Sequence, residues 1–373
     1  RLLMIRHYNL FSLRGAGHCG RVFRKVFCAT PEGQAPPRHP RWMGVEPQNT
    51  PQPSSASTGL LEAAYQRITA AWVSSAQQLG CMDVHVLGEG DVDTEVLDPA
   101  HAVLKLNSGH TIPVVGLGVY LCEPGAQAYE AVLSALRLGY RHIDTAQVYG
   151  NESDVGRAVR DSGIPRKDIF VTSKLSIRNW GKSRAQAAID ESLKKLGLDY
   201  IDLFLLHAPG SLDTRAETWA VLESYHRQGK LRSIGVSNFG VVHLEKLAQT
   251  AQVTPAVNQI ELHPFLQWPR LVQYCQSKDI IVEAYSPLAK GQKLDDPTVK
   301  QLAQKLNVTP AQLLIRWGIQ KGFVSLPKST VPARQEVNLN VFSITIPDDD
   351  MATLDGLEAD FVTGWDPIRD APV

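Results

Sequence analysis

Residues 139–156 read Gly-Tyr-Arg-His-Ile-Asp-Thr-Ala-Gln-Val-Tyr-Gly-Asn-Glu-Ser-Asp-Val-Gly. The stretch 141–145 predicts a short strand that carries Asp144 near its carboxyl end, and Tyr149 follows in the loop before a helical segment. Barrel enzymes place functional side chains at the carboxyl ends of strands and in the loops that follow, so that these side chains face one common mouth. The pair is also compatible with an Asp that caps a turn and a Tyr that covers the core.

Short apolar strands alternate with amphipathic helices from residue 101 onward, a pattern typical of a parallel sheet. We expect a hairpin at 103–106 and 111–113, followed by strands at 115–119, 141–145, 169–174, 201–207, 232–237, 256–261, 281–285 and 323–327. One intervening helix, 184–196, would be capped by Ser183 and ended by Gly197. Eight such units predict an α/β fold, a (β/α)8 TIM barrel over 101–373 preceded by the hairpin. The rival, a doubly wound sheet, would normally carry a Gly-rich phosphate loop after its first strand, and none is present there.

The first 100 residues differ in composition from the rest. Residues 1–44 hold eight Lys or Arg and a single acidic residue, Glu32, which is the balance of an organellar transit peptide. We therefore expect 1–100 to be a largely disordered extension with one short helix at 60–79. The protein is expected in the cytoplasm, or in a plastid or mitochondrion if 1–44 is a transit peptide. Residues 15–20 match the dinucleotide pattern G-x-G-x-x-G, but no acidic residue lies about 20 positions on, so we interpret the match as chance.

Charge and cysteine content narrow the function classes. The 373 residues have a formal net charge of +0, so nothing in the overall balance points to nucleic acid or an anionic membrane as partner. No apolar run approaches the roughly 20 residues of a membrane helix. The five cysteines are scattered without Cys-x-x-Cys spacing, which fits a reducing compartment and predicts no metal site. No long apolar helix face is left over, so we expect a monomer.

Polar side chains end seven consecutive predicted strands. They are Asp144 with Tyr149, Lys174, His207, Ser237 with Asn238, Gln259, Tyr285 with Ser286, and Lys328 with Ser329. The carboxyl ends of barrel strands share one pocket, so these side chains should meet. A purely structural barrel would gain nothing from burying Asp, Lys and His together, because each ion is costly to desolvate unless it is paired. The pattern therefore predicts an active site.

The side chains of Asp144, Tyr149, Lys174 and His207 suit proton delivery to a carbonyl oxygen. A free phenol has a pKa of about 10, and the Lys174 ammonium group should lower it. Asp144 can hold that ammonium group, and His207 can direct the carbonyl group or relay the proton. General acid catalysis contributes only about 10²- to 10⁴-fold in rate. Because no Ser or Cys nucleophile motif is visible, a coenzyme hydride is the expected attacking group. A barrel isomerase or aldolase with Lys174 as a Schiff-base lysine is the alternative.

Five motifs stand in the order found in the aldo-keto reductase family. They are Gly-Tyr-Arg-His-Ile-Asp-Thr-Ala from Gly139, Leu-Leu-His from Leu205, Gly-Val-Ser-Asn-Phe from Gly235, Asn-Gln-Ile-Glu from Asn258 and Leu-Pro-Lys-Ser from Leu326. The chain resembles this family over about 102–370, and its microbial and plant-like members more than the animal aldose reductases. The resemblance implies a catalytic tetrad of Asp144, Tyr149, Lys174 and His207. It also implies NADPH-dependent reduction of an aldehyde or ketone, with Tyr149 as proton donor. The alternative is a catalytically weak nucleotide-sensing barrel, similar to the potassium-channel β subunits of this family.

The resemblance also implies the coenzyme contacts. Ser237, Asn238 and Gln259 would hold the carboxamide, Tyr285 would stack on the nicotinamide ring, and Ser286 and Leu288 would line the same site. Lys328, Ser329 and Arg334 would surround the phosphate that distinguishes NADPH from NADH, and Asn338 would contact the adenine. This chain has Val337 where relatives often carry a Glu beside that Asn.

Tyr120, Ser176 and His207 are the expected substrate contacts. Tyr120, Ser176 and Ala208 stand where many animal members of the family carry tryptophans, so we expect a wider and more polar mouth suited to sugar-derived or small keto substrates. Trp180 and Trp365 would either restore an apolar wall or pack under the loops.

Overall fold

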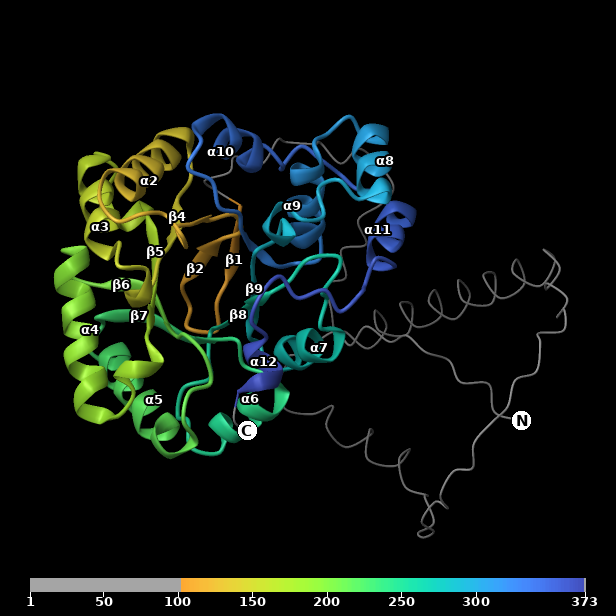
Figure 1. Ribbon diagram of the computed structural model, residues 1–373. Helices are drawn as coiled ribbons and strands as arrows, with labels where there is room; N and C mark the ends of the chain where they lie inside the picture. Colours follow the sequence, from red (N-terminus) through yellow and green to blue (C-terminus); the bar gives the residue numbers. More distant parts are fainter. Residues whose placement is uncertain (1–101, 372–373) are drawn as a thin grey trace, which may run out of the picture. The chain divides into compact units, whose positions relative to one another are not determined.

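The computed structural model describes residues 102–371, and within this range eight parallel strands form one closed barrel (Figure 1). In sheet order they are β3 (Leu117–Gly118), β4 (His142–Asp144), β5 (Phe170–Leu175), β6 (Ile201–Leu206), β7 (Leu231–Ser237), β8 (Val257–Glu261), β9 (Ile281–Tyr285) and β10 (Val324–Leu326). The barrel closes where the Gly116 N–H donates to the Ser325 carbonyl at 2.9 Å. This arrangement confirms the predicted (β/α)8 barrel and excludes the doubly wound sheet.

Helices cover the outside of the barrel in the part of the chain that the structure describes (Figure 1). They are α2 (Ala126–Leu138), α3 (Glu152–Asp161), α4 (Lys182–Leu196), α5 (Leu212–Arg227), α6 (Val241–Ala248), α7 (Pro269–Ser277), α8 (Pro297–Lys305), α9 (Pro310–Gln320), α10 (Pro332–Leu339), α11 (Asp348–Asp355) and α12 (Pro367–Asp370). The helix predicted at 184–196 begins at Lys182 instead, because Gly181, with φ of 102°, is its N-cap in place of Ser183. Gly197 ends it as predicted, in the left-handed conformation that glycine tolerates best.

The predicted hairpin, β1 (Val103–Lys105) and β2 (Thr111–Pro113), packs against the amino-terminal ends of the barrel strands. Leu106 and Ile112 share a buried apolar cluster with residues that begin strands, such as Phe170 and Val257. This cluster closes one end of the barrel, so a site inside the barrel has to open at the carboxyl ends of the strands.

Several predictions concern parts of the chain that lie outside the described residues. These are the extension 1–100, the basic segment 1–44, the match at 15–20 and the helix at 60–79. Between residues 102 and 371, no helix combines the length and the apolar character needed to cross a membrane.

Candidate active site

A cavity of about 1150 Å³ lies at the carboxyl ends of the strands. Of the predicted site residues, its wall contains Tyr120, Asp144, Tyr149, His207, Ser237, Asn238, Gln259, Tyr285, Ser286, Leu288, Lys328, Ser329, Arg334 and Asn338. Pockets for drug-sized ligands usually measure about 300–1,000 Å³. The cavity is therefore large enough for a dinucleotide together with a small substrate.

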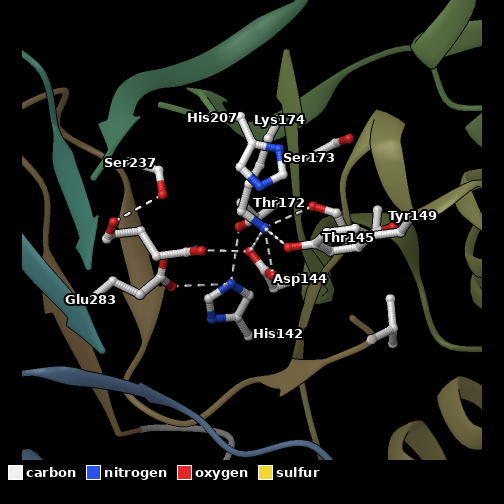
Figure 2. Close-up of polar contacts among 12 residues, drawn as sticks. His142, Asp144, Thr145, Tyr149, Thr172, Ser173, Lys174, His207, Ser237 and Glu283 are labelled. Atoms are coloured by element: carbon white, nitrogen blue, oxygen red, sulfur yellow. Dashed lines mark hydrogen bonds and ion pairs between the residues drawn. The ribbon is translucent and has the colours of Figure 1, made fainter. Parts of the chain in front are cut away.

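Lys174 and Asp144 form a buried ion pair directly beneath this cavity (Figure 2). The Lys174 Nζ lies 2.6 and 2.7 Å from the two carboxylate oxygens of Asp144 and donates to the Thr145 carbonyl oxygen at 3.0 Å. The Lys174 side chain is only 1% exposed. Burial disfavours the charge on Lys174, but the Asp144 carboxylate outweighs it and raises the pKa of the ammonium group. A raised pKa leaves less of the free amine that a Schiff base requires, which argues against the aldolase alternative.

Tyr149 ends a short 3-10 turn, η2 (Gln147–Tyr149), and its hydroxyl oxygen lies 3.4 Å from the Lys174 Nζ (Figure 2). Burial raises the pKa of Tyr149 to about 12, although the positive charge of Lys174 acts in the opposite direction. The net direction is therefore opposite to the lowering expected from the sequence, because desolvation exceeds the attraction of one ammonium group. The phenol consequently stays protonated at neutral pH.

His207 follows β6, and its imidazole ring packs edge-to-face with the Tyr149 ring, at a centroid distance of 5.7 Å and an interplanar angle of 79°. Burial, reinforced by the nearby charge of Lys174, lowers the pKa of His207 to about 3. The imidazole is therefore neutral at physiological pH. A neutral ring can direct a carbonyl group toward Tyr149 but is a poor source of protons.

Two amide side chains hold the loop that carries Tyr149, and the sequence reasoning missed both. Asn151 is fully buried, accepts from the Thr145 hydroxyl at 2.7 Å, and donates to the carbonyl oxygens of Val119 and Cys122. The side-chain oxygen of Gln147 accepts two hydrogen bonds from residues 176 and 179, and its side-chain nitrogen donates two to residues 188 and 192 of α4. The sequence could have pointed to both residues, because each is an amide two positions from Tyr149.

The residues predicted to hold the nicotinamide are hydrogen-bonded to one another. The Ser237 hydroxyl donates to the main-chain carbonyl oxygen of Gln259 at 2.9 Å, and the Asn238 side-chain amide donates to the Ser237 hydroxyl at 3.0 Å. Tyr285 donates its hydroxyl hydrogen to the Asn238 side-chain oxygen at 3.0 Å. Asn238 has a φ of 64°, a left-handed conformation that directs its side chain back across the end of β7. Amide, hydroxyl and aromatic groups together suit a nicotinamide carboxamide and ring.

Another group of residues in the cavity wall is cationic. Lys328 and Ser329 follow β10, and Arg334 lies in the first turn of α10. Neither Lys328 nor Arg334 forms an ion pair with another residue in the range 102–371. Two unpaired cations beside a helix amino terminus suit a phosphate group. Asn338 is buried in the same wall, and the neighbouring Val337 lines it as well. The residues present therefore fit a phosphorylated dinucleotide.

The mouth of the cavity carries exposed apolar side chains. Leu121, Val148 and Trp365 line it with 70%, 57% and 60% of their surfaces exposed. Tyr120 lies beside them, its ring centroid 5.1 Å from that of Tyr149. Leu121 and Trp365 come from loops far apart in the sequence, so no local pattern brings them together.

The structure does not bring Ser176 into the cavity. Its hydroxyl accepts from the Arg178 N–H at 3.3 Å and caps the turn η4 (Ile177–Asn179). Ala208 is also absent from the cavity wall. The two tryptophans differ in position. Trp180 is 2% exposed and packs against Gly210, whereas Trp365 lines the mouth of the cavity.

Residues 123–359 match the model of the Aldo/keto reductase family. Glyoxal reductase of Bacillus subtilis (strain 168) is 43% identical over 264 residues, which cover 71% of this chain and 95% of that protein. Glycerol 2-dehydrogenase (NADP(+)) of Saccharomyces cerevisiae is 41% identical over 277 residues, 66% of this chain and 88% of that protein. A crystal structure of an aldo-keto reductase from a Medee basin deep-sea metagenome library has a TM-score of 0.68 and 42% identity, and the match covers 70% of this chain and 96% of that one. Together with the barrel and its cavity, these matches show that the chain belongs to the aldo/keto reductase family of oxidoreductases.

Proposed function

We propose that the protein reduces an aldehyde or ketone to the alcohol with NADPH, and that Tyr149 is the proton donor. One observation carries the proposal: a single cavity contains a phenol next to a buried Lys–Asp pair and a separate cationic wall formed by Lys328 and Arg334. The first part suits a reacting carbonyl group and the second suits the additional phosphate of NADPH. The named activities of the yeast and Bacillus relatives support the same class of reaction.

Tyr149, Lys174 and His207 have different roles in the proton transfer. Bound NADPH would supply the hydride. The substrate oxygen accepts a hydrogen bond from the Tyr149 hydroxyl, while the neutral His207 orients the carbonyl group. As negative charge develops on that oxygen, the phenol transfers its proton. The transfer is favourable even from a pKa of about 12, because an alkoxide is a stronger base than a phenolate.

Lys174 and Asp144 act on the phenolate that this transfer leaves behind. The ammonium group, 3.4 Å from the Tyr149 oxygen, stabilises the phenolate, and Asp144 keeps that ammonium group charged and in place. The phenolate then regains a proton from solvent.

The proposal is tested by mixing the purified protein with NADPH and a panel of aldehydes and ketones. Consumption of NADPH that depends on the carbonyl compound, with formation of the alcohol, is the expected result. Nucleotide binding without turnover of any carbonyl compound would favour the nucleotide-sensing alternative. Turnover of a substrate without nucleotide would contradict the proposal.

Arg334→Leu is expected to weaken NADPH binding by about 10- to 100-fold, because a hydrogen bond between charged partners contributes about 1.5–3 kcal/mol. NADH lacks the additional phosphate, so its affinity should stay the same. The dissociation constants of both nucleotides, measured by quenching of protein fluorescence, check this. Arg227→Leu, which removes an exposed arginine at the end of α5, is the matched control. An equal loss for both nucleotides would contradict the assignment of Arg334 to the phosphate.

The apolar mouth favours carbonyl compounds with an apolar or aromatic body. Trp365→Ala is expected to raise KM for an aromatic aldehyde by roughly three- to tenfold, through loss of buried apolar contact. The KM for a small hydrophilic aldehyde should change less, and kcat should not change. Steady-state kinetics with both substrates check this, with Ile177→Ala as a control because Ile177 is exposed but outside the cavity wall. Equal effects on both substrates would contradict an apolar contact.

A further inference from the structure

Glu283 is a fully buried carboxyl group that the proposed mechanism does not use. It lies within β9, where it is the register partner of Gln259 on the adjacent β8. His142 of β4, also fully buried, approaches it across the barrel interior (Figure 2). The charged or titratable groups that face Glu283 are His142 and Asp144 on β4 and Lys174 on β5.

Two carboxyl groups determine which way the Gln259 amide points. The Gln259 Nε2 donates to Asp144 Oδ2 at 2.8 Å and to Glu283 Oε2 at 2.7 Å. A side-chain amide nitrogen carries two hydrogens, so both are used. The reverse orientation would place the amide oxygen against two carboxyl oxygens with no hydrogen from the amide between them. Gln259 therefore has only its side-chain oxygen left for a ligand, and that oxygen suits the NH2 group of a carboxamide.

The tautomer of His142 follows from its neighbours. The His142 Nδ1 lies 3.4 Å from the Pro113 carbonyl oxygen, which can only accept, so Nδ1 carries the hydrogen. In a neutral ring Nε2 is then an acceptor, and it lies 3.0 Å from the Thr172 hydroxyl and 3.6 Å from Glu283 Oε1. Glu283 Oε1 has no hydrogen-bond partner among residues 102–371. An ionised Oε1 would place its negative charge 3.6 Å from the unprotonated Nε2 of His142, and a hydrogen on Oε1 removes this repulsion without requiring a hydrogen bond at that distance.

The charge balance of the cluster agrees with a neutral carboxyl group. Lys174 and Asp144 already cancel one another, so an ionised Glu283 beside a neutral His142 would leave one uncompensated negative charge in the barrel interior. Uncompensated buried charges are strongly disfavoured. Burial and the neighbouring Asp144 raise the pKa of Glu283 to about 8, and burial lowers the pKa of His142 to about 3.

We propose that Glu283 is a positioning residue that stays protonated in the folded protein. Its Oε2 accepts from Gln259, its hydroxyl group is turned toward His142, and it thereby holds the Gln259 amide with the oxygen facing the coenzyme. The coenzyme part of this inference rests on the proposed function. The protonation of Glu283 does not, because it follows from contacts within the chain.

The protonation state is tested by comparing the stability of the wild type and Glu283→Gln across pH, without coenzyme. The glutamine amide, like a protonated carboxyl group, has an acceptor oxygen and a neutral donor group. A carboxyl group whose pKa rises from 4.5 to about 8 on folding keeps its proton in the native state while the unfolded chain loses it. The wild type should therefore lose stability relative to Glu283→Gln as pH rises from about 4.5 to about 8, and the difference should then level off.

The opposite slope would overturn this part of the proposal. If Glu283 were ionised and paired with a protonated His142, its pKa would fall on folding, and Glu283→Gln would lose stability relative to the wild type on the acid side. Urea unfolding at a series of pH values measures the difference, and a pH-independent difference would also refute a protonated Glu283. The infrared band of a protonated carboxyl group, present in the wild type at neutral pH and missing in Glu283→Gln, gives an independent check.

The positioning role is tested by NADPH binding at neutral pH. Glu283→Met removes the acceptor for Gln259 and is expected to weaken NADPH binding about tenfold, whereas Glu283→Gln should stay within about twofold of the wild type. Glu152→Met is the matched control, since Glu152 is a buried carboxyl group bonded to Ser173 and does not contact Gln259. Equal affinities of Glu283→Met and the wild type would refute the positioning role alone. Failure of the wild type to bind NADPH would refute the proposed function and the coenzyme part of this inference, and would leave the stability test of protonation decisive for Glu283.

Discussion

Tyr149→Phe is expected to lower kcat for carbonyl reduction by about 10²- to 10⁴-fold and to change NADPH affinity by less than about twofold, because general acid catalysis acts only in the transition state. The substitution removes the hydroxyl group 3.4 Å from the Lys174 Nζ and leaves the ring beside His207. Without the phenol, no positioned acid protonates the developing alkoxide. The measurement is single-turnover reduction of one aldehyde with saturating NADPH, together with a fluorescence titration of the nucleotide.

Tyr129→Phe is the control for Tyr149→Phe. Its hydroxyl donates to Asp161 at 3.0 Å, away from the cavity, so the same loss of one oxygen should leave turnover unchanged. Tyr149→Phe with wild-type kcat would contradict the assignment of the proton donor. A large loss of NADPH affinity in this variant would show that the phenol contributes to the coenzyme site instead.

Lys174→Met is expected to lower the free energy of unfolding by about 3–5 kcal/mol and to abolish turnover, since removing one partner of a buried ion pair leaves the other charge uncompensated. Asp144 is 4% exposed and would keep only the Gln259 amide as a side-chain donor. Turnover fails because the Tyr149 phenolate loses its ammonium partner. Urea unfolding and NADPH consumption measure the two effects.

The double variant Asp144→Asn/Lys174→Met separates stability from catalysis. With both charges removed, no buried ion remains unpaired, so the double variant should be more stable than Lys174→Met and still inactive. Lys195→Met is the control for loss of a lysine, because Lys195 forms an exposed pair with Glu191 and its removal should cost at most about 1 kcal/mol. If the double variant regained turnover, or if Lys174→Met were as stable as the wild type, the role of the pair would be contradicted.

Several features of the fold could be predicted from the sequence, because the strands of a barrel are buried on both faces and therefore appear as short apolar runs. Strands such as β6 and β9 are short apolar runs bounded by loops, and the structure has them at the predicted positions. The polar residues at their carboxyl ends stood out because each interrupts an apolar pattern. The carboxyl ends of parallel strands in a barrel face one opening, so the residues at these ends were expected to meet. All of them line one cavity except Lys174, which lies beneath it.

Other features depend on contacts between distant segments, and no local pattern reveals them. Ser176 directly follows β5, but its hydroxyl accepts from the Arg178 N–H at the start of η4 and does not line the cavity. The sequence around Trp180 and Trp365 does not show which of the two is buried. In the structure Trp180 packs against Gly210 and is buried, whereas Trp365 is exposed. Glu283 is visible in the sequence as an acidic residue inside an apolar strand. Its protonation state and its role can be inferred only from the contacts with His142 and Gln259.

The sequence by itself determined the barrel, its hairpin and the set of polar residues at the strand ends, among them Asp144 and Tyr149, because these depend on periodicity and on the topology of parallel strands. The tertiary structure alone decided the ionisation states and the character of the mouth. Burial sets the pKa of Tyr149 to about 12 and that of His207 to about 3, and desolvation depends on every group packed around the site. In the same way, loops far apart in the chain bring Leu121 and Trp365 to one rim and make it apolar.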